Sequence, residues 1–193
     1  MSILSAPIIK STSNVIQLYQ KTSLRTSAAL LFGSLFLALS SHIQVPMIPV
    51  PMTMQTFAVT LLGALYGWRL GSMAIILWLG QGALGLPVLA GGVTDLHYFV
   101  GPTAGYLFSL PIAGALMGWL AQKGWNGNRV YLAFCGMVLS STCCLFFGWA
   151  WLATIIGYQQ ALVLGVIPFI AGEIIKCSLG AVTLKLLTRT KAK

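Results

Sequence analysis

Residues 130–156 read VYLAFCGMVLSSTCCLFFGWAWLATII and contain no charged side chain. An α-helix needs about 20 apolar residues to cross the hydrocarbon core of a bilayer, and this stretch exceeds that length. Its apolar residues follow one another in runs instead of alternating, so the pattern does not fit a strand of a transmembrane β-barrel. The stretch therefore predicts a membrane-spanning helix.

The rest of the chain has the same character. Of its 193 residues, 58% are apolar and 7% are charged, whereas about 25% are charged in a typical soluble domain. The eleven basic residues are spread thinly, which argues against a nucleic-acid-binding face. The composition predicts an all-α integral membrane protein in contact with lipid. No GxxxxGK[ST] phosphate loop occurs, so any ATPase would be a separate subunit.

Five further apolar runs accompany residues 130–156 and predict a six-transmembrane-helix bundle over residues 25–193. Residues 1–24 lack the apolar core of a signal peptide, so we expect them to stay on the chain as an N-terminal segment, and the distribution of basic residues makes this segment cytoplasmic. The six runs cover about 26–44, 53–67, 70–86, 103–121, 130–156 and 162–187.

Ten of the eleven basic residues fall at the ends of the chain or in alternate connections between these runs. The other connections, at about 41–52, 86–102 and 157–161, contain no Lys or Arg. By the positive-inside rule, six spans place both termini and the basic connections in the cytoplasm. Five or seven spans would break this alternation. The ten residues are Lys10, Lys21, Arg25, Arg69, Lys123, Arg129, Lys185, Arg189, Lys191 and Lys193, and the eleventh, Lys176, lies inside the last run.

Polar residues interrupt the apolar pattern at residues 41–56, 85–103 and 168–176. Three prolines in the first segment exclude a helix and predict a stiff loop, and the Gly-rich second segment predicts a lid. In the third, Glu173 and Lys176 are three residues apart and share one helix face. Charges inside a membrane usually face a cavity or each other. The pair therefore predicts a ligand site, with a structural ion pair as the alternative.

Other candidates have plainer explanations. Small residues at Ala28, Ala29 and Gly33 on the first helix permit close contact with a partner subunit or with the chain's own helices. The four cysteines lie inside the apolar runs and form no CxxC, so we expect packing roles and no metal site. His42 and His97 are isolated from each other in the sequence, and we expect surface positions for both.

Four segments resemble the BioY family, the biotin-binding S components of energy-coupling-factor (ECF) vitamin transporters. They occur in family order and spacing across about residues 25–188, and the Gly-Pro-Thr-x-Gly-Tyr segment that follows Gly-Leu-Pro-Val is specific. The resemblance implies six helices around an outward-facing biotin pocket, which the loops after the first and third helices would cap. The matching segments lie within residues 50–56, 85–92, 101–106 and 168–176.

The resemblance also implies pocket residues. In the family an acid and a lysine, three apart on the sixth helix, contact the vitamin; here they are Glu173 and Lys176, with glutamate in place of the usual aspartate. Biotin has a urea ring with two N–H donors and one carbonyl, so Glu173 can accept from the N–H groups. Lys176 can donate to the carbonyl or pair with the ligand carboxylate. This chain has Val93 and Leu107 where some members have asparagine and arginine. The other predicted site residues are Gln55, Gly92, Thr94, Asp95, Phe99, Tyr106 and Phe169.

By the same resemblance, the protein works with a transmembrane coupling protein and a pair of ABC ATPases in the bacterial cytoplasmic membrane. Ala28, Ala29 and Gly33 would contact the coupling protein. The alternatives are an S component for another small vitamin, a solitary biotin transporter without ATPase partners, and a structural subunit in which Glu173 and Lys176 could both be replaced by apolar residues. A membrane enzyme would need an acid–base or metal constellation, so we expect no catalytic residue and no cofactor.

Overall fold

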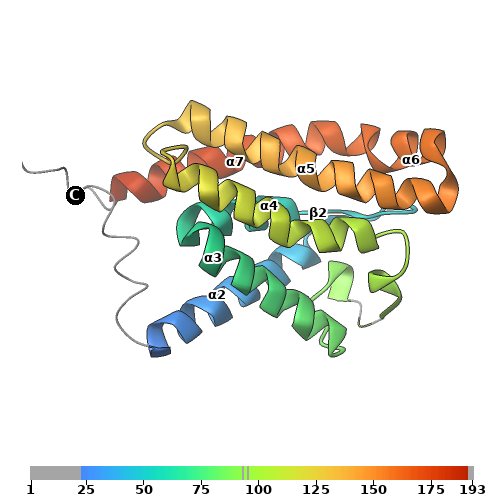
Figure 1. Cartoon of the computed structure of the whole chain (residues 1–193), viewed down its shortest axis with the longest axis horizontal. Helices are drawn as coiled ribbons and strands as arrows, with labels where there is room; N and C mark the ends of the chain where they lie inside the picture. The colour runs from blue at the N-terminus through green and yellow to red at the C-terminus, as the bar shows by residue number, and fades with distance from the viewer. Residues whose placement is uncertain (1–22, 93, 95, 191–193) are drawn as a thin grey trace, which may run out of the picture.

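The computed structural model describes residues 23–92, 94 and 96–190. Most of the predicted N-terminal segment 1–24, and Asp95 among the predicted site residues, lie outside the described residues. Helices dominate the fold, and two short strands pair in an antiparallel hairpin (Figure 1). The elements in chain order are α2 (Ser23–His42), β1 (Gln44–Val45), β2 (Met52–Thr53), α3 (Gln55–Ala83), η1 (Ala90–Gly92), η2 (Leu96–Phe99), α4 (Ala104–Gln122), α5 (Val130–Ile156), α6 (Tyr158–Gly165) and α7 (Ile167–Thr190).

Five helical stretches are long and apolar enough to cross a membrane in the described part of the chain. The second and third predicted spans form one element, α3, which is broken at Gly67 by a backbone with φ 78° and ψ 173°. A Cβ added at Gly71 would lie 3.1 Å from Gly63 Cα, although eight residues of a straight helix span about 12 Å. The parts of α3 before and after Gly67, its two limbs, therefore fold back on each other.

Glycines also allow α3 and α4 to touch through their backbones. A Cβ at Gly63 would collide with the carbonyl oxygen of Gly114, and a Cβ at Gly118 would collide with the backbone of Gly67 and Trp68. Lipid tails supply no hydrophobic drive between helices, so close backbone packing of this kind is a main source of their association. These glycines therefore pack two of the chain's own helices against each other.

The end of the bundle where the chain passes from α5 to α7 differs from the prediction. Residues 157–161 were expected to be a loop, but Gly157, with φ 86°, turns the chain directly into α6. Helix α7 then begins at Ile167, with Pro168 in its first turn, where a proline costs no helical hydrogen bond. The last predicted run is therefore divided between α6 and α7.

The connections gather at two opposite ends of the bundle (Figure 1). One end holds the start of α2, the break in α3, the α4–α5 connection and the end of α7. Gly127 closely approaches Leu184 and Thr188, so the α4–α5 connection is in contact with the end of α7. The other end holds the strand hairpin and the segment with η1 and η2. This segment is anchored by Trp78 Nε1 and Ser41 Oγ, which donate to the Val88 carbonyl over 2.9 and 2.6 Å.

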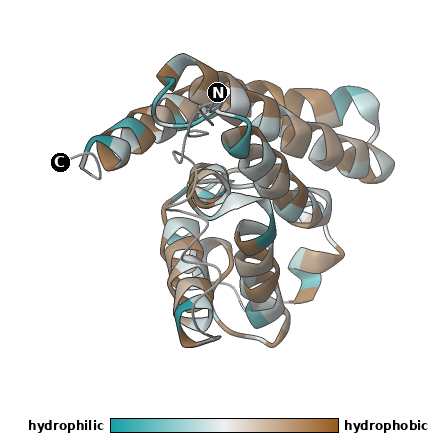
Figure 2. Cartoon of the chain, turned by 60° about the vertical axis from the view of Figure 1, so that its left-hand side comes forward, coloured by the Kyte–Doolittle hydropathy of each residue, from teal (hydrophilic) through white to brown (hydrophobic). Residues whose placement is uncertain are grey.

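The helices consist mainly of hydrophobic residues, and hydrophilic residues occur toward the helix ends and connections (Figure 2). Many of the large apolar side chains of the helices are exposed. Phe32 on α2 is 70% exposed, and Phe146 on α5 and Ile175 on α7 are also exposed. Such surface is unfavourable in water but suits the hydrocarbon of a bilayer. The predicted class of helical membrane protein agrees with this surface.

A substitution at Gly118 tests the backbone contact between α3 and α4. Gly118→Val would push a branched side chain into Gly67 and Trp68, so we expect the purified protein in detergent to melt several degrees lower or fail to assemble, since overpacking costs about 1–3 kcal/mol. The matched control is Gly80→Val in α3, where an added Cβ meets nothing within 4 Å. Equal melting temperatures for the two variants would contradict the tight contact.

Candidate functional site

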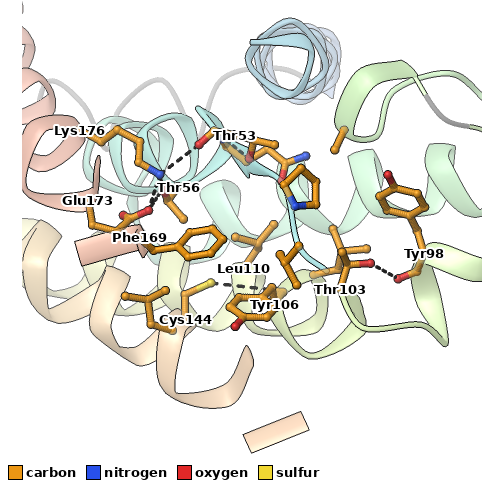
Figure 3. Close-up of a pocket in the computed structure, with 16 residues that line it drawn as sticks. Thr53, Thr56, Tyr98, Thr103, Tyr106, Leu110, Cys144, Phe169, Glu173 and Lys176 are labelled. Atoms are coloured by element: carbon orange, nitrogen blue, oxygen red, sulfur yellow. Dashed lines mark hydrogen bonds and ion pairs between the residues drawn. The ribbon is translucent and has the colours of Figure 1, made fainter. Parts of the chain in front are cut away.

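A cavity lies inside the bundle (Figure 3). It is enclosed by α4, α5, α7 and the part of α3 before Gly67, and it lies next to the strand hairpin and the η1–η2 segment. Its wall is mostly apolar, and the space that the centre of a water molecule can occupy in it measures about 60 Å³. The sixteen lining residues are Val50, Pro51, Thr53, Gln55, Thr56, Ala90, Tyr98, Thr103, Tyr106, Leu107, Leu110, Cys144, Leu145, Phe169, Glu173 and Lys176.

Glu173 and Lys176 lie one turn apart on α7 and form an ion pair through Glu173 Oε1. Each is only 6% exposed. Lys176 Nζ also donates to the Thr53 carbonyl over 3.0 Å and to Thr56 Oγ1 over 2.8 Å. An ammonium group has three donors, so all three are used within the chain. Lys176 thus ties α7 to the start of α3.

Thr56 completes this cluster. Its hydroxyl accepts from Lys176 and donates to Glu173 Oε1 over 2.9 Å, so it connects both charged groups to α3. Buried charges are tolerated when they are paired and hydrogen-bonded. Thr56 therefore fixes the position of the carboxylate in the cavity wall.

Two buried polar atoms of the lining have no hydrogen-bond partner among the described residues: Glu173 Oε2 and Gln55 Nε2. Gln55 is the first residue of α3 and is 7% exposed. A buried polar group left unpaired costs about 1–3 kcal/mol. One of these atoms is an acceptor and the other is a donor, so a ligand that presents both an N–H group and a carbonyl would satisfy them together.

Tyr106 forms a fixed apolar wall of the cavity. Its ring stacks on Phe169 with centroids 6.2 Å apart and planes 20° apart, and its hydroxyl donates to the Gly165 carbonyl over 2.7 Å. A Cβ at Gly148 would collide with the ring. The ring is therefore held between α4, α5 and the end of α6, where it lines the cavity.

The structure brings five of the nine predicted site residues into the lining: Gln55, Tyr106, Phe169, Glu173 and Lys176. Three others lie outside it. Phe99 packs its ring against Phe108 at 6.1 Å, Thr94 is exposed, and Gly92, with φ 75°, lies close to His42.

Several lining residues were not predicted. Thr56 was visible in the sequence only as part of the segment entering α3. Cys144, expected to be a packing residue, is 2% exposed and lies on the cavity wall with its sulfur 3.1 Å from Ser109 Oγ. Neither the hydroxyl nor the thiol carries a charge that marks it in an apolar run, so only the fold could reveal them.

The predicted contact residues for a coupling protein differ in exposure. Ala28 is exposed on α2 and Ala29 is half-buried. Gly33 is buried, and a Cβ there would lie 3.1 Å from Ala74 and 3.2 Å from the Tyr66 ring. Gly33 therefore packs against α3, and Ala28 is the member of this group available to a partner.

The fold and the cavity define the class first. The structure superimposes with a TM-score of 0.78 on a crystal structure titled as the S-component for biotin from an ECF-type ABC transporter, at 25% identity over 88% of this chain and 94% of that chain. Residues 12–193 match the model of the BioY family. The chain belongs to the BioY family.

Relatives agree with this assignment. The chain is 37% identical to a "Probable biotin transporter BioY" of Pyrococcus horikoshii, over 75% of this chain and 86% of the relative. It is 34% identical to the "Biotin transporter BioY" of Rhizobium etli, over 78% and 86%. Both are named as transporters. The described residues contain no group of three or more His, Cys, Asp or Glu placed to hold a metal ion.

Thr56→Val tests the threonine bridge, because valine keeps the volume and removes the hydroxyl. Hydrogen bonds to charged groups are worth about 1.5–3 kcal/mol each, so we expect the melting temperature in detergent to fall by at least about 3 °C. Thr183→Val is the matched control, since the Thr183 hydroxyl bonds only the Leu179 carbonyl of its own helix. An unchanged melting temperature for Thr56→Val would show that the bridge contributes nothing to stability.

Proposed function

We propose that this protein binds biotin with high affinity and takes it up across the cytoplasmic membrane as the substrate-specific subunit of an ECF-type ABC transporter. The observation that carries the proposal is the buried Glu173–Lys176 pair, which leaves Glu173 Oε2 without a partner among the described residues, in a mostly apolar cavity. The family and the solved S-component support the same ligand.

The cavity suits the chemistry of biotin. Glu173 Oε2 can accept from an N–H of the urea ring, and Gln55 Nε2 can donate to its carbonyl. Tyr106 and Phe169 can pack against the thioether ring. The sequence suggested that Lys176 donates to the ligand, but its donors are already used by Thr53, Thr56 and Glu173. In this proposal Lys176 acts by holding the Glu173 carboxylate in place.

Biotin must reach the cavity from outside the bundle. The lining includes Val50 and Pro51 of the strand hairpin, and Ala90 and Tyr98 of the η1–η2 segment. In this proposal these two connections are the part of the wall that moves to admit the vitamin.

We further propose that each limb of α3 crosses the membrane, which gives six crossings with both termini in the cytoplasm. The support is the sharp break at Gly67 and the position of Arg69 beside it. Described basic residues also occur at the start of α2, in the α4–α5 connection and near the end of α7, which lie at the same end of the bundle (Figure 1). The positive-inside rule then makes that end cytoplasmic.

Partners follow from the class. The sequence has no phosphate-binding loop, so ATP hydrolysis would come from ABC ATPase subunits through a transmembrane coupling protein. The exposed Ala28 on α2 is our candidate contact for the coupling protein. Transport that persists in cells lacking both partners would show that this protein takes up the vitamin alone.

The decisive experiment is equilibrium binding of radiolabelled biotin to the purified protein in detergent. We expect a Kd near nanomolar, about −12 kcal/mol. Glu173→Gln should weaken binding by at least about tenfold, since a hydrogen bond to a charged group contributes about 1.5–3 kcal/mol. Lys176→Ala should do the same because it leaves the buried carboxylate unpaired.

Lys185→Ala is the control for these variants, because Lys185 is an exposed lysine of the same helix. Melting temperatures would show that each variant is folded. Nanomolar binding that survives Glu173→Gln would keep biotin as ligand and reject this site. A folded wild-type protein that binds no biotin would reject the vitamin and point to another small vitamin.

The orientation is tested by labelling intact cells with a membrane-impermeant maleimide. We expect Gln159→Cys, at the start of α6, to be labelled from outside, and Asn128→Cys, in the α4–α5 connection, to be labelled only after permeabilisation. Both positions are exposed, and the parent protein gives the background of the four native cysteines. The reverse pattern would invert the orientation, and equal labelling of both positions would contradict it.

A further inference from the structure

The charge content of the cavity is small and already balanced. Among its sixteen lining residues, Glu173 is the one acid and Lys176 the one base, and they pair with each other. Biotin carries its own negative charge on the carboxylate of its side chain. A carboxylate buried without a partner is costly, so the place of this group in the cavity decides what the protein can recognise.

The end of the cavity at α7 cannot take the carboxylate. All three Lys176 donors are used within the chain, and the Glu173 carboxylate beside them would repel a second anion. The same carboxylate, together with Gln55 Nε2, instead favours the uncharged urea ring. A bound biotin therefore points its urea ring toward α7 and its carboxylate away from it.

At the opposite end of the cavity, the described lining residues carry no charged side chain. Figure 3 shows Tyr98 and Thr103 there, away from Glu173 and Lys176. The Thr103 hydroxyl donates to the Tyr98 carbonyl over 3.0 Å, and no lysine or arginine other than Lys176 occurs in the described lining. A carboxylate at this end gains no ion pair from the described lining, so it is stable only where it stays in contact with water.

Resting on the proposed function, we propose that the protein recognises biotin through the urea ring and bicycle alone, and that it binds neutral biotin derivatives substituted at the carboxylate, such as amides and esters, nearly as tightly as biotin itself. The ligand class is thus wider than the free vitamin. It includes conjugates in which the carboxyl group is joined to an amine or an alcohol.

Competition against radiolabelled biotin on the purified full-length protein tests this inference. We expect biotinamide and biotin methyl ester to compete within about threefold of biotin, because a carboxylate that stays in water without an ion pair adds little to binding. Biotin blocked at a urea nitrogen should be at least about a hundredfold weaker, because it leaves Glu173 Oε2 unpaired in a buried site. Amide and ester that compete about tenfold or more weakly than biotin would overturn the inference.

A charge placed at the uncharged end gives a second measurement. In Thr103→Lys we expect biotin to be preferred over biotinamide by about tenfold, the size of a partly desolvated ion pair. Thr103→Met, which loses the same hydroxyl without gaining a charge, should show a ratio near one whatever its absolute affinity. A Thr103→Met protein that still favours biotin about tenfold would overturn the inference.

The two levels of the argument fail differently. Wild-type protein that binds biotin and rejects both neutral derivatives overturns this inference and leaves the proposed function intact. Folded wild-type protein that binds neither biotin nor its amide overturns the proposed function and this inference together.

Discussion

The buried ion pair between Glu173 and Lys176 is the constraint on which the cavity depends. Two charges inside a membrane protein are tolerated when they are paired and hydrogen-bonded. Thr53 at the end of β2 and Thr56 in the first turn of α3 supply hydrogen bonds to the pair. The pair therefore fixes how α7 lies against α3, and it leaves one carboxylate oxygen for the ligand. Structure and recognition arise from the same four residues.

Glycines determine the shape of the space around that pair. Gly67 lets α3 turn back, and Gly63 and Gly118 bring its limbs into backbone contact with α4. Gly148 and Gly165 leave the slot that holds the Tyr106 ring. Helices in lipid associate through close approach of their backbones. These glycines therefore determine where the larger side chains can be accommodated, and hence where the cavity forms.

Charge and hydropathy predicted the membrane class and singled out Glu173 and Lys176 as a ligand site, with an ion pair as the alternative, whereas Tyr106 and Phe169 came from the resemblance to the BioY family. It did not predict Thr56 or Cys144, since small polar residues inside apolar runs have no such mark. Phe99 was placed in the site, but its ring packs on Phe108. Hydropathy gives the depth of a residue along a span. It does not give the direction in which the side chain faces, and that direction separates a lining residue from a packing residue.

All three hydrogen-bond donors of the Lys176 ammonium group are used within the chain. This limits the movement that can release the vitamin from the cavity. Separating α7 from the start of α3 would expose a lysine, a carboxylate and a threonine hydroxyl to a poorly solvating interior at once. We therefore expect these two elements to travel as one rigid body through the transport cycle. Lys176 also holds Thr53 of β2, so we expect the vitamin to leave past the parts of the wall outside this cluster, which are the hairpin loop before β2 and the η1–η2 segment.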